Sequence, residues 1–252
     1  MSNSSLVSYI KISPNRTSPR NHKIDTISIH CAVGQFTAKE LLNLSNFTKY
    51  DAQRGSSCNY AVGRDGSIGM GVEEEDRSWC TSSRSNDHRA ITIEVASDTK
   101  HPYVVTDDAY EALIKLLVDI CERNNIKELK WKADKSLIGQ VDKQNMTVHR
   151  WFANKACPGD YLYERHGQIA KEVNSRLNGH KDSETKPFKV KVDIINLNIR
   201  KGPGINYDKI GKYTGKGVFT IVSESEGKGS TKGWGKLKSG AGWISLDYAR
   251  KI

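Results

Sequence analysis

The spacing of apolar residues changes once along this chain of 252 residues, near residue 180, and the change restricts the chain to a two-part fold. Before that point, runs with the two-residue period of strands alternate with runs that have the period of helices. After it, short strand-like runs are separated by glycines, and no helical period recurs. Residues 179–187 between the two parts are polar and end in proline, as is typical of a linker. We therefore predict domains at 1–178 and 188–252.

The first part is predicted to be an α/β domain, with a central, mostly parallel or mixed sheet flanked by helices. Thr106 is the expected N-cap of its longest helix. Strands are predicted at 24–30, 59–62, 67–70, 90–96 and 146–149, and helices at 38–47, 106–125 and 161–177. The second part, with runs such as 189–192 and 218–222 between glycines, is predicted to be a small all-β barrel.

The net charge of +10 is concentrated in the second part. Residues 1–180 hold 24 Lys and Arg against 22 Asp and Glu, a balance of +2, whereas residues 181–252 hold 15 against 7, a balance of +8. A basic module on a nearly neutral body predicts a polyanionic partner, which is nucleic acid, a membrane surface or an acidic cell-wall polymer. No block of five or more Lys and Arg occurs, so we expect no nucleic-acid binding.

Membrane insertion and export are not expected from the sequence. No apolar run approaches the roughly 18–20 residues that a membrane span needs. The first eight residues are polar and lack an apolar core, so we expect no signal peptide. The five cysteines are odd in number and irregularly spaced, which indicates reduced thiols rather than a disulfide framework.

Two histidines and one cysteine have the composition of a catalytic zinc site. His30 and His149 each end a predicted strand, and Cys157 precedes a Pro-Gly turn. Two imidazoles and one thiolate leave a fourth position for water, as catalytic zinc requires. Spacing alone leaves open the alternative of ordinary strand-end histidines. The other four cysteines are expected to be small buried residues, and Cys31 is expected to point away from the metal because it follows His30 on a strand.

The first part contains a series of motifs in a fixed order, which are His30, Ser56-Ser57-Cys58-Asn59-Tyr60, Asp65-Gly66, Arg77-Ser78-Trp79, Asn86, Ile91-Thr92-Ile93-Glu94-Val95 and His149-Arg150 with Lys155-Ala156-Cys157-Pro158-Gly159. These motifs resemble the type 2 N-acetylmuramoyl-L-alanine amidases, the zinc amidases that share a fold with peptidoglycan-recognition proteins and T7-type lysozyme. The resemblance covers roughly residues 6–178, and the segment around Cys157 is its most specific part. Residues 82–87 look most like the amidases of clostridia and their phages.

The resemblance implies one Zn²⁺ per chain, held by His30, His149 and Cys157. It implies that Glu94 moves the proton and that Lys155 stabilises the oxyanion during cleavage of the bond between the lactyl group of N-acetylmuramic acid and L-alanine. Glu94 also stands out in the sequence itself, because a charge in an apolar strand is costly without a role. Its alternative is an outward-facing strand residue.

The position of a catalytic Tyr in other branches of the family is held here by Cys58, so the resemblance favours the Glu-based mechanism. Tyr60, two residues later, is expected to face the same side of its strand as Cys58. Tyr60, Trp79, Asn86 and Trp151 are the candidates for substrate binding, with simple packing as the alternative.

The second part contains Asn-x-Arg-x-Gly-Pro at residues 198–203, continues with Gly-Trp-x-Lys at 233–236 and closes with Gly-Trp-Ile at 242–244. These motifs resemble the bacterial SH3 (SH3b) domain, a family that binds peptidoglycan. The candidate wall-binding residues are Asn198, Arg200, Trp234, Trp243 and Tyr248, with a core role as the alternative for the two tryptophans.

Together, these features predict a monomeric phage or prophage endolysin that acts on bacterial, clostridial-type Gram-positive peptidoglycan. It would stay in the host cytoplasm until lysis and then reach the cell wall. The alternatives are a non-catalytic peptidoglycan-binding recognition protein and a host autolysin.

Overall fold

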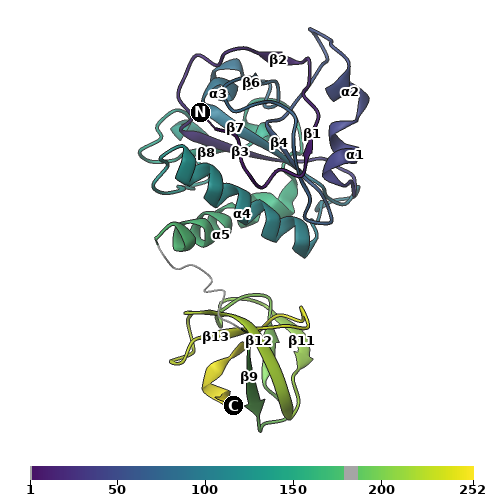
Figure 1. Ribbon diagram of the computed structural model, residues 1–252. Helices are drawn as coiled ribbons and strands as arrows, with labels where there is room; N and C mark the ends of the chain where they lie inside the picture. The colour runs from purple at the N-terminus through teal and green to yellow at the C-terminus, as the bar shows by residue number, and fades with distance from the viewer. Residues whose placement is uncertain (1, 179–186) are drawn as a thin grey trace. The chain divides into compact units, whose positions relative to one another are not determined.

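The computed structural model describes residues 2–178 and 187–252 of the chain. The chain divides into two units, Met1–Leu177 and Asn178–Ile252, and each is described here by itself (Figure 1). The linker predicted at 179–187 lies outside the described residues except for Pro187. In the part of the chain that the structure describes, no helix has the length and apolar character needed to span a membrane.

A six-stranded sheet with the order β1-β5-β4-β7-β3-β8 is the centre of the first unit. Only β4 and β5 are antiparallel, and the other neighbouring strands are parallel. This confirms the predicted mixed, mostly parallel sheet. The strands are β1 (Tyr9–Ile10), β3 (Thr26–Cys31), β4 (Tyr60–Val62), β5 (Ile68–Met70), β7 (Ala90–Val95) and β8 (Met146–Thr147), and β2 (Arg16–Thr17) pairs separately with β6 (Arg77–Ser78).

Helices cover this sheet, and two apolar clusters hold them there. The long helices α4 (Asp107–Arg123) and α5 (Gly159–Leu177) pack against each other and share one core with the isoleucines of β3 and β7. A smaller cluster joins α1 (Ala38–Leu42) and α2 (Ser45–Thr48) to β4. The short helix α3 (Arg84–Arg89) lies next to β6 and β7.

Two local predictions have different outcomes. Thr106 caps α4 as predicted, because its side chain accepts a hydrogen bond from the backbone N–H of Ala109. The helix predicted at 38–47 is instead two short helices, because Leu44 between them has an extended backbone.

The register of the central strands separates site residues from core residues. His30 lies opposite Glu94, and Glu94 lies opposite Ala61 on the next strand, so these three share one face of the sheet. Ile29 and Ile93 point to the other face, into the core beneath α4 and α5. The same alternation therefore builds the core and presents a histidine and a carboxylate together.

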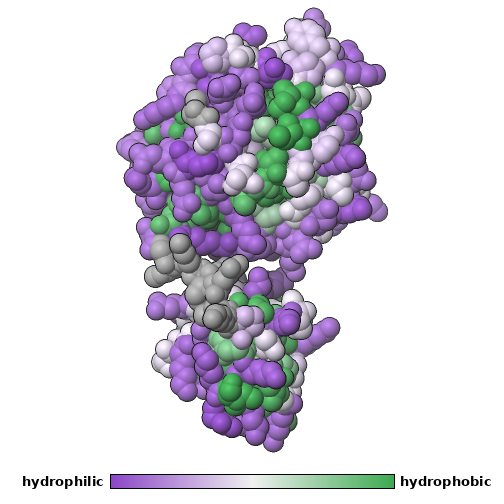
Figure 2. Space-filling view, in the orientation of Figure 1, coloured by the Kyte–Doolittle hydropathy of each residue, from purple (hydrophilic) through white to green (hydrophobic). Residues whose placement is uncertain are grey.

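The second unit is an all-β unit, as predicted. One seven-stranded sheet has the order β11-β10-β14-β13-β12-β9-β15, and its apolar residues form their own cluster. Its face in Figure 2 shows small apolar patches among polar side chains. The strands are β9 (Phe188–Val192), β10 (Asn198–Arg200), β11 (Lys209–Tyr213), β12 (Gly217–Ser225), β13 (Trp234–Leu237), β14 (Trp243–Ser245) and β15 (Ala249–Lys251).

We expect His166 to make the first unit sensitive to acid. Its ring is fully buried on α5, and burial lowers its pKa from 6.5 to about 4. At pH values between 6.5 and about 4, the His166 ring is protonated in the unfolded chain and neutral in the folded chain. The free energy of unfolding therefore falls as the pH falls. From pH 7 to pH 5 this histidine alone should reduce the free energy of unfolding by about 2 kcal/mol.

Urea titrations of the wild type and of His166→Phe at both pH values measure this effect. The loss of stability on acidification should be smaller in the variant. An equal loss in both proteins would show that His166 is not responsible.

Candidate metal centre and cleft

His30 and Glu94 stand at the carboxyl ends of neighbouring parallel strands. His30 is the penultimate residue of β3, and Glu94 is the penultimate residue of β7. In open α/β sheets, side chains at these strand ends border the crevice in which ligands bind. The His30 ring is fully buried, whereas 15% of the Glu94 side chain is exposed.

The three predicted metal ligands lie together. One ligand atom each from His30, His149 and Cys157 falls within 4.8 Å of the others. The Cys157 sulfur is 3.3 Å from His30 Nδ1, and the two imidazole centroids are 5.2 Å apart. His149 does not end a strand, because β8 stops at Thr147 and His149 begins the 3₁₀ turn η2 (His149–Trp151).

Hydrogen bonds determine which ring nitrogen each histidine can offer to a metal ion. The Ser28 hydroxyl donates to the Thr147 carbonyl, so its oxygen is left to accept from His30 Nε2, 3.2 Å away. This leaves His30 Nδ1 unprotonated and facing Cys157. Ser82 Oγ is 3.0 Å from His149 Nε2, so Nδ1 of that ring is the nitrogen left to bind a metal ion. Metal-binding histidines usually bond through the other ring nitrogen in this way.

The protonation states of His30 and Cys157 also fit a bound cation. Burial lowers the pKa of His30 to about 3, so the ring is neutral at ordinary pH. Contact with the Cys31 thiol, followed by burial, raises the pKa of Cys157 well above its usual range. Without a cation the Cys157 sulfur therefore keeps its proton, and a soft metal ion would displace that proton. Two imidazoles and one thiol suit Zn²⁺.

A short hydrogen-bonded turn carries two of the three ligands. The backbone N–H of Arg150 donates to the Cys157 carbonyl, and its guanidinium donates to the Ala156 carbonyl and to Asp160. Asp160 is also 2.6 Å from His101. These contacts close the segment between His149 and Cys157, so Arg150 holds both ligands in place.

Glu94 lies beside the metal ligands with few partners. Its Oε1 is 3.9 Å from His30 Nδ1 and 3.8 Å from the Cys80 sulfur, and its buried Oε2 has no hydrogen-bond partner within the described residues. Burial raises the pKa of Glu94 to about 7, and the thiol of Cys80 partly opposes this. The environment therefore poises this carboxyl for proton transfer near neutral pH.

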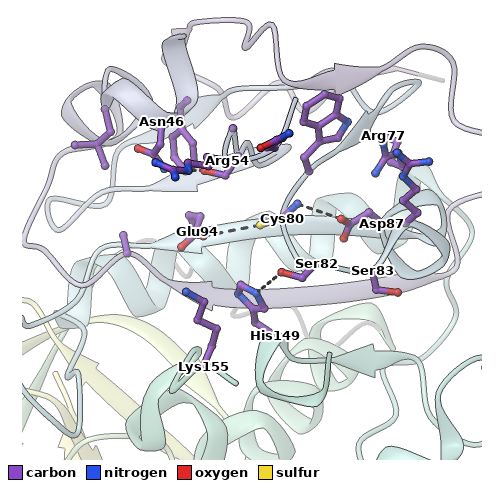
Figure 3. A pocket seen from close by; sticks show the side chains of 18 of the residues that line it. Asn46, Arg54, Arg77, Cys80, Ser82, Ser83, Asp87, Glu94, His149 and Lys155 are labelled. Atoms are coloured by element: carbon purple, nitrogen blue, oxygen red, sulfur yellow. Dashed lines mark hydrogen bonds between the residues drawn. The ribbon is translucent and has the colours of Figure 1, made fainter. Parts of the chain in front are cut away.

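A cleft of about 700 Å³ opens onto Glu94 and His149. In Figure 3, Lys155 lies with His149 on one side of Glu94, while Arg77 and Asp87 lie farther along the cleft. Arg54 and Arg84 add two more cations to its lining, and Trp79 adds an aromatic ring. Asp87 is buried, and the loop at Cys80 and Thr81 donates to both of its oxygens. The open part of the cleft is therefore basic.

The substrate-binding predictions are wrong for Tyr60 and find no support for two other residues. Tyr60 is fully buried, and its hydroxyl donates to Glu74 at 2.6 Å. It pairs with Ile93 and so faces the core, whereas Cys58 faces the cluster under α1. Asn86 and Trp151 are buried outside the cleft lining, and Trp151 stacks on Trp131. Trp79 and Lys155 line the cleft.

The cysteines are closer to the site than predicted. All of Cys31, Cys58, Cys80 and Cys121 are buried, as expected. Cys31 does not avoid the metal ligands, because its thiol contacts Cys157 and it lines the cleft. No role was predicted for Ser28, Ser82 or Arg77. Ser28 carried a signal because it precedes His30 by two residues on one strand face, and Arg77 and Ser82 lie in segments that carry the family resemblance.

Three of the five wall-binding candidates have structural roles. Trp234 and Trp243 are 2% and 7% exposed, so both belong to the interior of the second unit. Arg200 donates to the carbonyls of Ile205 and Tyr207 and thereby secures that loop. Tyr248 is 58% exposed, and Asn198 is half-buried on β10.

One of the comparisons with known proteins identifies a family. A family model described as N-acetylmuramoyl-L-alanine amidase matches residues 20–160. No curated protein matches the chain by sequence. Among solved structures, PlyL is 17% identical with a TM-score of 0.48, over 66% of this chain and 96% of that one. The endolysin amidase LysCS from Clostridium intestinale URNW is 16% identical with a TM-score of 0.42, over 68% and 97%. Because these scores are below 0.5, the assignment rests on the family model.

We expect Cys157→Ser to weaken zinc binding at least about tenfold, because a hydroxyl is a poorer zinc ligand than a thiolate. Competition with a chromophoric chelator measures the affinity. Cys121→Ser is the control, since Cys121 is a buried thiol that lies in the core of α4, away from the metal ligands. Equal zinc affinity in the two variants would exclude Cys157 as a ligand.

Proposed function

Because the chain belongs to the N-acetylmuramoyl-L-alanine amidase family, we propose that it is a zinc-dependent peptidoglycan hydrolase with one Zn²⁺ per chain. The bond cleaved is the amide between the lactyl group of N-acetylmuramic acid and L-alanine of the stem peptide. The observation that carries this proposal is the placement of a poorly solvated carboxylate, Glu94, beside the donor set of His30, His149 and Cys157 in an open cleft.

Amide hydrolysis needs a proton acceptor beside an electrophile that is otherwise unreactive. His30, His149 and Cys157 would hold a Zn²⁺ ion, which would supply a Lewis acid to polarise the carbonyl and acidify water. Glu94 accepts the proton of the attacking water and passes it to the leaving nitrogen. Its Oε1 lies 3.9 Å from His30 Nδ1, so the carboxylate stands beside the metal ligands, where these transfers would occur.

Lys155 and the cationic lining assist the reaction at two places in the cleft. Lys155 is exposed at the Glu94 end, where its ammonium would stabilise the carbonyl oxygen as that oxygen gains negative charge. Farther along, Arg77 is only 6% exposed, and its Nε has no hydrogen-bond partner within the described residues. The charge of these side chains favours the carboxylates of a stem peptide.

For the second unit we propose a bacterial SH3 fold that binds the cell wall. The burial of Trp234 and Trp243 removes them as contacts, so the support comes from charge and exposed residues. Lys209 and Lys212 are exposed on β11, Lys216 is exposed directly before β12, and Tyr213 on β11 is 59% exposed. This combination suits an anionic polymer with sugar rings.

The proposed biological role is a lytic enzyme of phage or prophage origin. It would act on clostridial-type Gram-positive walls after release from the host cytoplasm. A non-catalytic recognition protein is disfavoured by the presence of three metal donors together with Glu94 and Lys155. A host autolysin would share the chemistry and differ only in its route to the wall.

The proposed reaction is tested by digesting purified Gram-positive walls with and without a chelator. We expect new N-terminal alanine without new reducing sugar ends, and we expect the chelator to abolish it. Glu94→Gln should reduce the rate about 10²–10⁴-fold while it retains zinc, because the amide cannot accept the proton. Glu128→Gln, at an exposed carboxyl, is the control. New reducing ends would instead identify a glycosidase.

The wall-binding role is tested with the triple variant Lys209→Gln, Lys212→Gln and Lys216→Gln of the full chain. We expect several-fold weaker binding to purified walls and a weaker dependence on salt, because fewer charges meet the polymer. The control changes Lys127, Lys132 and Lys135, exposed lysines of the first unit, to Gln. Equal losses in both triple variants would mean that β11 has no special part in binding.

A further inference from the structure

A second set of metal donors overlaps the first at His30. One ligand atom each from His30, Cys80 and Glu94 lies within 4.8 Å of the others. The distances are 3.8 Å from the Cys80 sulfur to Glu94 Oε1 and 3.9 Å from His30 Nδ1 to the same oxygen. A tetrahedral zinc ion would place a thiolate sulfur and a carboxylate oxygen about 3.6 Å apart, so small side-chain rotations complete the set.

The two sets exclude each other because they share one atom. His30 Nδ1 faces Cys157 at 3.3 Å and Glu94 at 3.9 Å, while Nε2 is 3.2 Å from Ser28 Oγ. One ion uses Nδ1 at a time. An ion held with His149 and Cys157 leaves Glu94 free, whereas an ion held with Cys80 takes Glu94 as a ligand.

Glu94 and Cys80 have the capacity to take an ion. Within the described residues Glu94 Oε2 is buried without a hydrogen-bond partner, and Oε1 has long contacts with the Cys80 thiol and with His30 Nδ1. A poorly solvated carboxylate gains stability from a neighbouring cation. Cys80 is 8% exposed and lines the cleft, so an ion entering from solvent reaches it. Nitrogen, sulfur and oxygen donors together suit Zn²⁺ and the softer, larger Cd²⁺.

We propose that the metal ion has two alternative positions, and that in the second it is held by His30, Cys80 and Glu94. On binding, the Cys80 thiol releases its proton to water as the metal–sulfur bond forms. One carboxylate oxygen of Glu94 is then engaged by the ion, and the charge of the ion makes the other oxygen a weaker proton acceptor. The second position is therefore less active in hydrolysis, a consequence that rests on the proposed function, whereas the donor set itself does not.

Cadmium binding tests the second position without measuring hydrolysis. The full chain and its variants are loaded with Cd²⁺, and bound metal and the ultraviolet thiolate-to-cadmium charge-transfer band are recorded. Cys157→Ser should still bind Cd²⁺, although more weakly. It should also keep the charge-transfer band, because Cys80 supplies the thiolate. Cys157→Ser combined with Cys80→Ser should lose that band and bind Cd²⁺ at least about tenfold more weakly than Cys157→Ser alone.

Two further double variants make the result specific. Cys157→Ser with Cys31→Ser should keep the band, because Cys31 belongs to neither donor set. Cys157→Ser with Glu94→Gln should bind Cd²⁺ more weakly than Cys157→Ser, and this comparison leaves the Cys80 thiol intact if its replacement disturbs folding. Circular dichroism confirms that each variant is folded.

A Cys157→Ser protein without a thiolate band would overturn the proposal. Loss of the band with Cys31→Ser, or its survival with Cys80→Ser, would overturn it as well. None of these outcomes depends on hydrolysis, so the amidase proposal is tested separately by wall digestion.

Discussion

The pairing of β3 with β7 on one side and β8 on the other is the constraint on which the site depends. It places His30 opposite Glu94 and brings the Thr147 carbonyl to the Ser28 hydroxyl, which in turn fixes the tautomer of His30. A slip of one residue would turn His30 toward α4 and expose Ile29 to the cleft. Because the core would fail in the same step, the stability of the sheet protects the geometry of the metal ligands.

The floor of the cleft combines apolar packing with groups that are costly to bury. His30 is neutral, and the pKa values of Glu94 and of the Cys80 thiol are raised, all mainly because water is excluded. Such a site is poorly satisfied by the protein alone. Its donor atoms are suited to bind a cation, which explains why two donor sets can coexist within a few ångströms.

The sequence was sufficient to predict the elements that have a strong period and the residues fixed to them. Alternation placed His30 and Glu94 on strands, and the Pro-Gly turn marked Cys157. Tyr60 was misplaced because strict alternation was assumed from Cys58, whereas β4 begins only at Tyr60 and the two side chains face opposite sides. Trp234 and Trp243 were misread because an aromatic residue in a small barrel serves the core as readily as a ligand.

The side chains that line the cleft could not be predicted from the sequence for a different reason. Arg54, Arg77 and Arg84 come from loops and short elements whose positions depend on tertiary packing rather than on local period. The proximity of Cys31 and Cys80 to the ligands likewise follows from how side chains fill the space around the strand ends, which no spacing rule describes.

The turn closed by Arg150 has a consequence for the order of folding. It separates His149 from Cys157 by only seven residues, whereas His30 is more than a hundred residues away along the chain. Closing so short a loop costs little chain entropy, so of the three ligands these two come together most easily in an unfolded polypeptide. The ion would then travel with the turn and become fully coordinated only when β3 takes its place between β7 and β8, so that metal capture and sheet assembly are successive stages of one process.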